Sequence, residues 1–399
     1  MRKSLQLAIL AILAALAAAV LPFSAPAAQI EVNPPIVIHM PSEPRAAMLQ
    51  ARGFVAEGNL GKAVRLLALY VAAHPDQSGP ARLLGDLYYR QGDFPHAEAA
   101  YKAILARHPN DRETHNRLGS VYATENRIDA AIRQFDLSLP GTDSVPNLVR
   151  LHERKGDLAE YVFGAKREAS AYPADPNAQI QLAQIYRALY RPDLAILYFK
   201  RAMDNAPNSL LALNGLGLSY LDEMDYAKAV GYFKRCRAQA PRGYSCIVNL
   251  GAAYLEENRL DKAQAALVVA HGLRPERPEA LVNFGYLADS RGDWRRAIRY
   301  YVEALTVYPY SVDAYIDLGW EYQQHKLYAL AESALLKGLA VAPDDGRLHF
   351  LLGQAYADQG KVALALSEFK AATGSADPDV RRIAQARLAR MQPPPVKKP

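Results

Sequence analysis

The chain has 399 residues, half of them apolar, and a formal net charge of +6. Arg2 and Lys3 supply two of these charges, so the rest of the chain carries only +4, much of it near the C-terminus. A nucleic-acid-binding protein concentrates positive charge in a stripe that neutralises several phosphates. No such stripe is visible in the sequence, which excludes nucleic acid as the expected partner.

The N-terminus has the pattern of a secretory signal. Arg2 and Lys3 precede an apolar run from Leu5 to Leu21, and Ala25-Pro26-Ala27 offers small residues for cleavage. Residues 1–27 are therefore predicted to be a signal peptide that exports the protein to the periplasm. The run is long enough that an inner-membrane anchor over residues 4–23 remains an alternative, and secretion from the cell is another. No cysteine lies near the cleavage site, which excludes a lipoprotein.

Residues 28–43 are rich in proline and are expected to form an extended linker. Beyond this linker the sequence repeats with a fixed period. Alanine recurs every 34 residues, at positions 195, 229, 263, 297, 331 and 365, and so does proline, at positions 173, 207, 241, 275, 309 and 343. A period of this length predicts an array of helix-turn-helix units, each burying its apolar face against its neighbours.

One unit shows the pattern clearly. Leu216 and Tyr220 share one stripe of a first helix, and Gly217 beside them lets a second helix approach closely. Phe233 anchors that second helix, and Pro241 marks the turn into the next unit.

These residues resemble the tetratricopeptide repeat family, in which Leu-Gly-x2-Tyr is followed by a small residue, an aromatic residue and a proline. Leu-Gly-x2-Tyr begins at Leu84, Leu118, Leu216, Leu250, Leu318 and Leu352. The resemblance implies an all-α, right-handed superhelical solenoid of about ten units over residues 44–379. The units begin near Pro44, Ser78, Arg112, Thr142, Pro176, Leu210, Tyr244, Pro278, Val312 and Gly346. Residues 380–391 are expected to form a capping helix, and residues 392–399 a disordered tail.

The pattern is irregular near residues 140–175. The third and fourth units are only 30 residues apart, Pro140 and Gly141 interrupt the second helix, and Tyr161 replaces the usual alanine. Two interpretations remain open. The fourth unit is a degenerate repeat with a shortened helix, or this region is a kink or hinge between two segments of the solenoid.

The sequence offers no recognisable catalytic or metal-binding motif. Zinc-binding spacings, a nucleophile elbow and a glycine-rich phosphate loop are all missing. We therefore expect a non-enzymatic protein without a cofactor or metal. Cys236 and Cys246 lie five residues on either side of Pro241, so an antiparallel helix pair places them opposite each other. A disulfide and two separate buried thiols are both compatible with this spacing.

The resemblance also implies a concave groove lined by the first helix of each unit. At position six of the units, Asn147, Gln181, Asn249, Asn283 and Asp317 resemble an amide ladder that holds a peptide backbone. At positions five and nine, an apolar strip contains Val248, Val282, Ile316, Tyr286 and Trp320. An exposed strip would mark an interaction site, whereas a tightly wound superhelix would bury it as core.

The function expected from these features is an envelope scaffold or adaptor that binds a partner protein or peptide in the groove, for example in secretion or envelope-complex assembly. The first alternative is a carbohydrate-binding solenoid associated with exopolysaccharide export. The second is a regulatory subunit of a partner enzyme. Contact with the membrane is expected only if the signal remains uncleaved.

Overall fold

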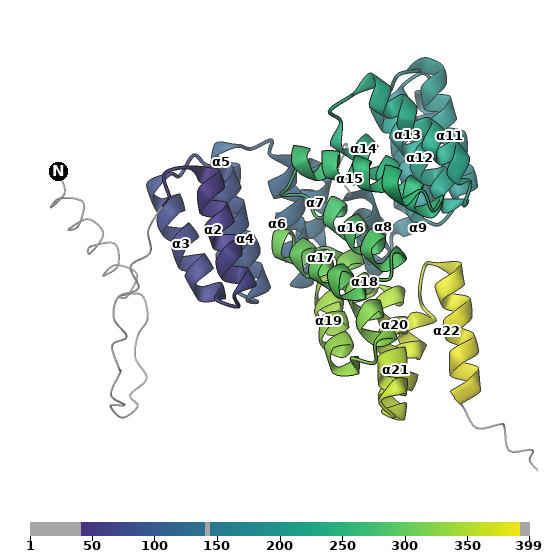
Figure 1. The fold of residues 1–399 in the computed structure, drawn as a ribbon. Coiled ribbons are helices and arrows are strands. Elements are labelled where there is room, and N and C mark those ends of the chain that lie inside the picture. Colours follow the sequence, from purple (N-terminus) through teal and green to yellow (C-terminus); the bar gives the residue numbers. More distant parts are fainter. Residues whose placement is uncertain (1–40, 140–143, 392–399) are drawn as a thin grey trace, which may run out of the picture. The chain divides into compact units, whose positions relative to one another are not determined.

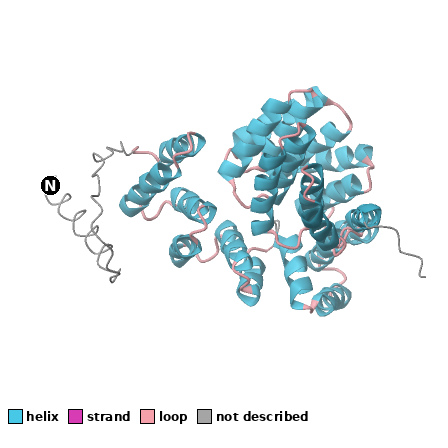
Figure 2. Cartoon of the chain, turned by 90° about the horizontal axis from the view of Figure 1, so that it is seen from below, coloured by secondary structure: helices cyan, strands magenta, loops and turns pink. Residues whose placement is uncertain are grey.

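The computed structural model describes residues 41–139 and 144–391, and every regular element within these stretches is an α-helix (Figures 1 and 2). The predicted signal peptide, most of the linker and the C-terminal tail lie outside the described residues. The helices pair into ten units. The first five units consist of α2 (Pro44–Ala56) and α3 (Leu60–Ala73), α4 (Ser78–Arg90) and α5 (Phe94–Arg107), α6 (Arg112–Thr124) and α7 (Ile128–Leu137), α8 (Ser144–Lys155) and α9 (Leu158–Ala171), and α10 (Pro176–Ala188) and α11 (Pro192–Asn205).

The remaining units follow the same order. They consist of α12 (Leu210–Asp222) and α13 (Tyr226–Gln239), α14 (Tyr244–Glu256) and α15 (Leu260–Leu273), α16 (Glu279–Ser290) and α17 (Trp294–Val307), α18 (Val312–Gln324) and α19 (Tyr328–Val341), and α20 (Gly346–Asp358) and α21 (Val362–Ala372). A last helix, α22 (Pro378–Met391), packs against α20 and α21, and its Leu388 and Met391 contact the adjoining core. The all-α solenoid expected from the repeats is therefore confirmed.

The turn between the two helices of each unit contains one residue with a left-handed backbone. These residues are Gly58, Gly92, Asn126, Gly156, Tyr190, Met224, Asn258, Gly292, Lys326 and Gly360. Glycine adopts this conformation without steric cost and asparagine tolerates it, whereas other side chains are strained there. The backbone thus repeats with the sequence period, including the shorter step between the third and fourth units.

In seven of the ten units, a glycine on the first helix lies directly under a large side chain of the second; these glycines are Gly85, Gly119, Gly217, Gly251, Gly285, Gly319 and Gly353. A Cβ at Gly217 would overlap the Phe233 ring, and one at Gly285 would overlap the Tyr301 ring. Phe233 is fully buried and Tyr301 nearly so. These helix pairs therefore close over an aromatic ring or a leucine side chain, and neighbouring pairs stack into a core that runs along the solenoid.

The irregular region contains a shortened helix. Helix α7 has 10 residues, whereas α5 and α9 on either side have 14 each. Tyr161, at the position where other units have alanine, stacks on His152 with ring centroids 4.2 Å apart. These features agree with a degenerate repeat. Residues 140–143 lie outside the described residues, and the hinge interpretation is untested.

A disulfide joins the sixth unit to the seventh. Cys236 at the end of α13 is bonded to Cys246 near the start of α14, with Cα atoms 5.7 Å apart. Both cysteines are buried beside Leu213. Of the two states compatible with the sequence, the structure thus has the bonded one.

Candidate protein-binding groove

The first helices of the units supply the groove positions, but the groove is not open along its whole length. Helix α2 contacts α17, and α6 contacts α19, although these helices are distant in sequence. The first and third units therefore contact later parts of the solenoid.

The turn between α17 and α18 fills the groove of the second and third units. Tyr310 is buried there, with its ring centroid 3.9 Å from that of Tyr89. The hydroxyl oxygens of Tyr310 and Tyr101 are 2.8 Å apart, and Tyr101 donates a hydrogen bond of 2.6 Å to Asp86. Asp86 occupies position nine of α4, one of the groove positions, so the chain's own tyrosine lies where a ligand would lie.

A network of ion pairs holds the walls of this closed section. Arg117 on α6 binds Asp86 at 2.9 Å and Glu113 at 2.7 Å, and its guanidinium lies 5.0 Å from the centre of the Tyr308 ring. Arg82 binds Glu113 at 2.6 Å. Burial alone would raise the pKa of Glu113, but Arg117 and Arg82 together lower it to about 2. Glu113 is therefore ionised at neutral pH, whereas burial raises the pKa of Asp86 despite its contact with Arg117.

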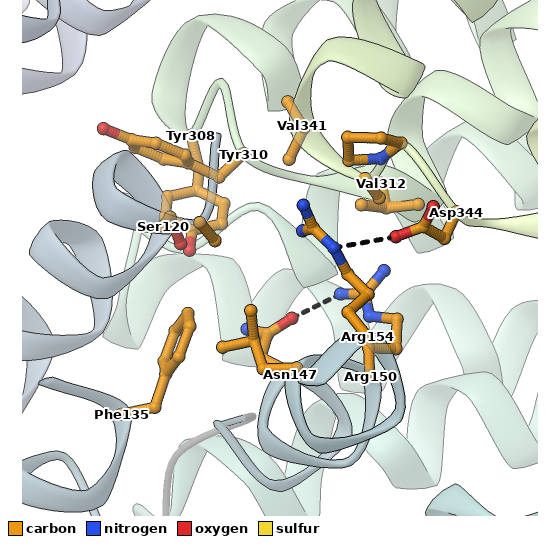
Figure 3. A pocket seen from close by; sticks show the side chains of 14 residues that line it. Ser120, Phe135, Asn147, Arg150, Arg154, Tyr308, Tyr310, Val312, Val341 and Asp344 are labelled. Atoms are coloured by element: carbon orange, nitrogen blue, oxygen red, sulfur yellow. Dashed lines mark hydrogen bonds and ion pairs between the residues drawn. The ribbon is translucent and has the colours of Figure 1, made fainter. Parts of the chain in front are cut away.

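A small cavity of about 70 Å³ remains beside this contact (Figure 3). Arg154 on α8 reaches across to Asp344, at 3.0 Å, and Arg150 lies 3.9 Å from Asp345. Asn147 lines the same cavity and accepts a hydrogen bond from Arg150. Figure 3 shows Asn147 and both arginines pointing toward the turns that contain Tyr308 and Asp344. Asn147 therefore belongs to the closed section and not to an open ladder.

The other residues of the predicted amide ladder have different surroundings. Asn249 donates a hydrogen bond of 2.9 Å to Asn214 of the preceding unit. Gln181, Asn283 and Asp317 are partly exposed. The ladder is interrupted in the sixth unit, where the Phe199 ring leaves room only for Gly215. A continuous row of amides is thus absent from this stretch of the groove.

The predicted apolar strip is divided between core and surface. Val248 is only 3% exposed, so including it in the groove surface was wrong; it packs in the core between neighbouring units. Val282 and Ile316 are partly buried and pack against the C-terminal core. Tyr286 and Trp320, at position nine, are 41% and 42% exposed. The eighth and ninth units therefore present two aromatic rings to solvent.

Acidic side chains lie near one of these rings, since the charges of Asp289 and Asp317 both act on the Tyr286 hydroxyl. Burial, reinforced by Asp313, raises the pKa of Asp317 to about 7, and burial reinforced by Asp289 does the same for Glu321. Sequence reasoning identified Asp317 but missed Asp289 and Glu321. Glu321 could have been found, because it occupies position ten of its unit, where most other units have an apolar or small residue.

The described residues contain neither a helix that could span a membrane nor a cluster of metal-binding side chains. No helix in residues 41–139 or 144–391 is both long and apolar enough to cross a membrane. Within the same stretches, no three histidine, cysteine, aspartate or glutamate side chains are grouped so that they could hold a metal ion.

The structure is that of a helical-repeat solenoid with a partly open groove, and sequence comparison defines its family. Profiles described as tetratricopeptide repeat match residues 82–146, 180–244, 280–309 and 316–380, which together exceed half of the chain. The chain therefore belongs to the tetratricopeptide repeat family.

Two curated relatives share part of the sequence. Both are called cellulose synthase operon protein C. The protein from Pseudomonas fluorescens (strain SBW25) is 26% identical over 149 residues, which are 34% of this chain and 12% of the relative. The protein from Xanthomonas axonopodis pv. citri (strain 306) is 28% identical over 179 residues, which are 42% of this chain and 11% of the relative. The chain thus spans only about a tenth of each relative.

Two solved structures are similar to this chain over most of its length. A chain of the APC/C hetero-tetramer Cut9-Hcn1 is 14% identical, with a TM-score of 0.48, and the match covers 88% of this chain and 90% of that one. Yeast Tom70 is 13% identical, with a TM-score of 0.45, and the match covers 87% of this chain and 95% of that one.

Proposed function

We propose that this protein is a non-enzymatic scaffold that binds a partner protein or peptide along the open part of its concave groove. The observation that carries the proposal is the exposure of Tyr286 and Trp320 on neighbouring first helices. Aromatic side chains are enriched among the residues that contribute most to protein binding. Solenoids of this kind offer extended concave surfaces suited to such partners.

We place the scaffold in the bacterial envelope, with the periplasm as its compartment. Two features support this location. The first 27 residues have the charge pattern and small residues of a cleavable export signal. The bond between Cys236 and Cys246 is of the kind that persists in oxidising compartments such as the periplasm. An inner-membrane anchor over residues 4–23 is the alternative form, and it also places the solenoid outside the cytoplasm.

Cross-linking from defined positions tests this function. A photoreactive amino acid in place of Trp320 should capture an envelope protein in intact cells, because this side chain faces the open groove. The matched control is Val268 on α15, which is 56% exposed on a second helix. Capture from position 320 but not from position 268 supports the groove. Equal capture from both positions, or capture only from position 268, contradicts it.

A second candidate is carbohydrate binding during the assembly of an exported polysaccharide. Exposed aromatic rings beside the partly exposed Asn283 could stack on and hydrogen-bond a sugar chain. The operon named in both relatives is consistent with such a process. Titration with cello-oligosaccharides distinguishes the candidates. Saturable binding that is lost in Trp320→Ala favours the carbohydrate-binding function. Absence of binding favours the protein-binding function.

A further inference from the structure

The turn between α17 and α18 lies against a group of side chains that the second and third units assemble without it. This group, called here the tyrosine cradle, consists of Asp86 and Tyr89 on α4, Tyr101 on α5 and Arg117 on α6. Arg117 binds Asp86 at 2.9 Å, and Tyr101 donates a hydrogen bond of 2.6 Å to Asp86. Both contacts lie within units two and three, so the cradle is complete before the turn enters it.

The turn contributes one hydroxyl and its aromatic ring to the centre of the cradle. Tyr101 gives its single proton to Asp86, so the hydroxyl of Tyr310, at 2.8 Å, donates to the Tyr101 oxygen. The Tyr310 ring lies 3.9 Å from the Tyr89 ring, and Tyr310 is only 4% exposed. The cradle thus fits a tyrosine, because phenylalanine lacks the donor and an aliphatic side chain lacks both the donor and the ring.

The contact that holds the turn in place is small. In the described part of the chain, the apolar cluster around Tyr101 takes three residues from units beyond the fourth, namely Tyr308, Tyr310 and Val341. The ion pair between Arg154 and Asp344 crosses the same junction, but Asp344 is 58% exposed. Exposed ion pairs contribute little because water and salt screen them. Separation of the turn therefore costs a limited contact and leaves the cores on either side intact.

The packing around the turn is also incomplete. The cavity of about 70 Å³ is lined by Tyr308 and Tyr310 of the turn together with Phe135, Asn147 and Arg150 (Figure 3). Protein interiors normally leave few voids larger than a water molecule, because each void forfeits contacts between its walls. A segment that occupied both the cradle and this cavity would make contacts that the turn does not make.

We propose that the tyrosine cradle is a second partner-binding site, specific for a tyrosine-bearing segment of a partner protein, and that the chain's own turn occupies it until such a segment displaces the turn. The turn identifies the chemistry that fits, a tyrosine directly after a proline. Occupation by the turn lowers the affinity for the partner in proportion to the fraction of molecules that are closed. The inference goes beyond the groove around Tyr286 and Trp320 and does not depend on it.

Fluorescence anisotropy of a labelled peptide with the sequence of residues 305–313 measures access to the cradle. Tyr310→Ala should bind this peptide at least about tenfold more tightly than the wild-type protein, because the competing tyrosine is gone. The matched control is Tyr172→Ala at the end of α9, where the tyrosine is 63% exposed. It should bind as weakly as the wild type. A peptide with alanine at both tyrosine positions should not bind.

The hydroxyl contact is tested in the Tyr310→Ala protein. Tyr101→Phe should weaken peptide binding by about fivefold, and so should phenylalanine in place of the second tyrosine of the peptide, since each change removes the same hydrogen bond. The two changes together should therefore weaken binding no further than either one alone. Additive losses would contradict the assigned contact.

Hydroxyl-radical footprinting of the wild-type protein tests displacement without any substitution that could unfold the chain. A saturating amount of the unlabelled peptide, synthesised with heavy isotopes, should raise the oxidation of Tyr310 as the turn leaves the cradle. Tyr89 should stay protected, because a tyrosine of the peptide takes its place beside the ring.

Three results would overturn the inference. They are equal peptide affinity in the wild-type protein and Tyr310→Ala, absence of binding by a folded Tyr310→Ala protein, and continued protection of Tyr310 at saturating peptide. A wild-type dimer that dissociates in Tyr310→Ala would assign the cradle to the turn of a second copy of the chain, and would overturn the assignment to a different partner. None of these results affects capture from position 320, so the proposed function is tested separately.

Discussion

Glu321 places a carboxylate at position ten of the ninth unit, where most other units have an apolar or small side chain. Burial and the nearby Asp289 raise its pKa from 4.5 to about 7. The folded protein therefore binds this proton more tightly than the unfolded chain does. Ionisation of Glu321 costs stability progressively as the pH rises from about 4.5 toward 7, and the full cost is present above that range.

Glu321→Gln should therefore raise the unfolding midpoint at pH 8 by about 2 °C or more, because glutamine keeps the shape of the side chain and removes the buried charge. The gain should be smaller at pH 5, where Glu321 in the folded protein is already protonated. Thermal unfolding followed by circular dichroism at both pH values measures the difference. A lower midpoint at pH 8 would mean that a partner within the chain stabilises the carboxylate.

Trp320, the residue before Glu321 on α18, tests the exposed side of that helix through an apolar group. Because its side chain is 42% exposed, Trp320→Ala should leave the unfolding midpoint nearly unchanged while weakening partner binding by about 1 to 2 kcal/mol. Isothermal titration with the captured partner and thermal unfolding should be carried out on the same preparation. A loss of stability near 3 to 5 kcal/mol would place Trp320 in the core instead.

At the scale of the helix pair, the contact between Gly217 and Phe233 sets how closely α12 and α13 approach. Gly217→Leu should destabilise the solenoid by about 3 kcal/mol, because any side chain at this position overlaps the Phe233 ring. Gly231 in the same unit is the control, since no atom lies within 4 Å of a Cβ placed there. Gly231→Leu should be neutral or mildly stabilising. Equal effects of the two substitutions would show that the helix register is wrong.

The turns between paired helices provide a second test at this scale. Met224 has a left-handed backbone with φ of 59° and a side chain that is 75% exposed. Met224→Gly should therefore stabilise the protein by up to about 1 kcal/mol, because glycine relieves the strain and little packing is lost. The reverse change at an equivalent turn, Gly292→Met, should destabilise it. Denaturant unfolding of the two variants measures both signs, and a destabilising Met224→Gly would contradict the assignment of strain.

At the scale of the molecule, the sequence predicts the units more completely than their arrangement. Leu216, Gly217 and Phe233 identify the helix pair because they report local packing that every unit repeats. The docking of Tyr310 against Asp86 and Tyr101 depends on how many units complete a superhelical turn. Small rotations between units accumulate to set that number, and no short motif encodes it.

The same reason explains the mixed outcome for the groove. The sequence leaves open whether positions five and nine are exposed or core; neighbouring units cover Val248 at position five, whereas position nine leaves Tyr286 and Trp320 open. Asn147 is an amide side chain at position six, as the predicted ladder requires, yet it faces the chain's own turns. Whether a groove residue is available therefore depends on which distant unit lies opposite it.

Hydroxyl-radical footprinting of the free protein and of its complex with the captured partner tests the central claim most directly, since it reports side-chain access without any substitution. In the free protein, Tyr286 and Trp320 should be oxidised, whereas Tyr310 and Tyr89 should be protected by the closed section. Partner binding should then protect Tyr286 and Trp320 and leave Tyr310 and Tyr89 unchanged. Rapid oxidation of Tyr310 in the free protein, or undiminished oxidation of Trp320 in the complex, would contradict the account of a solenoid that is closed by its own turns and binds through the eighth and ninth units.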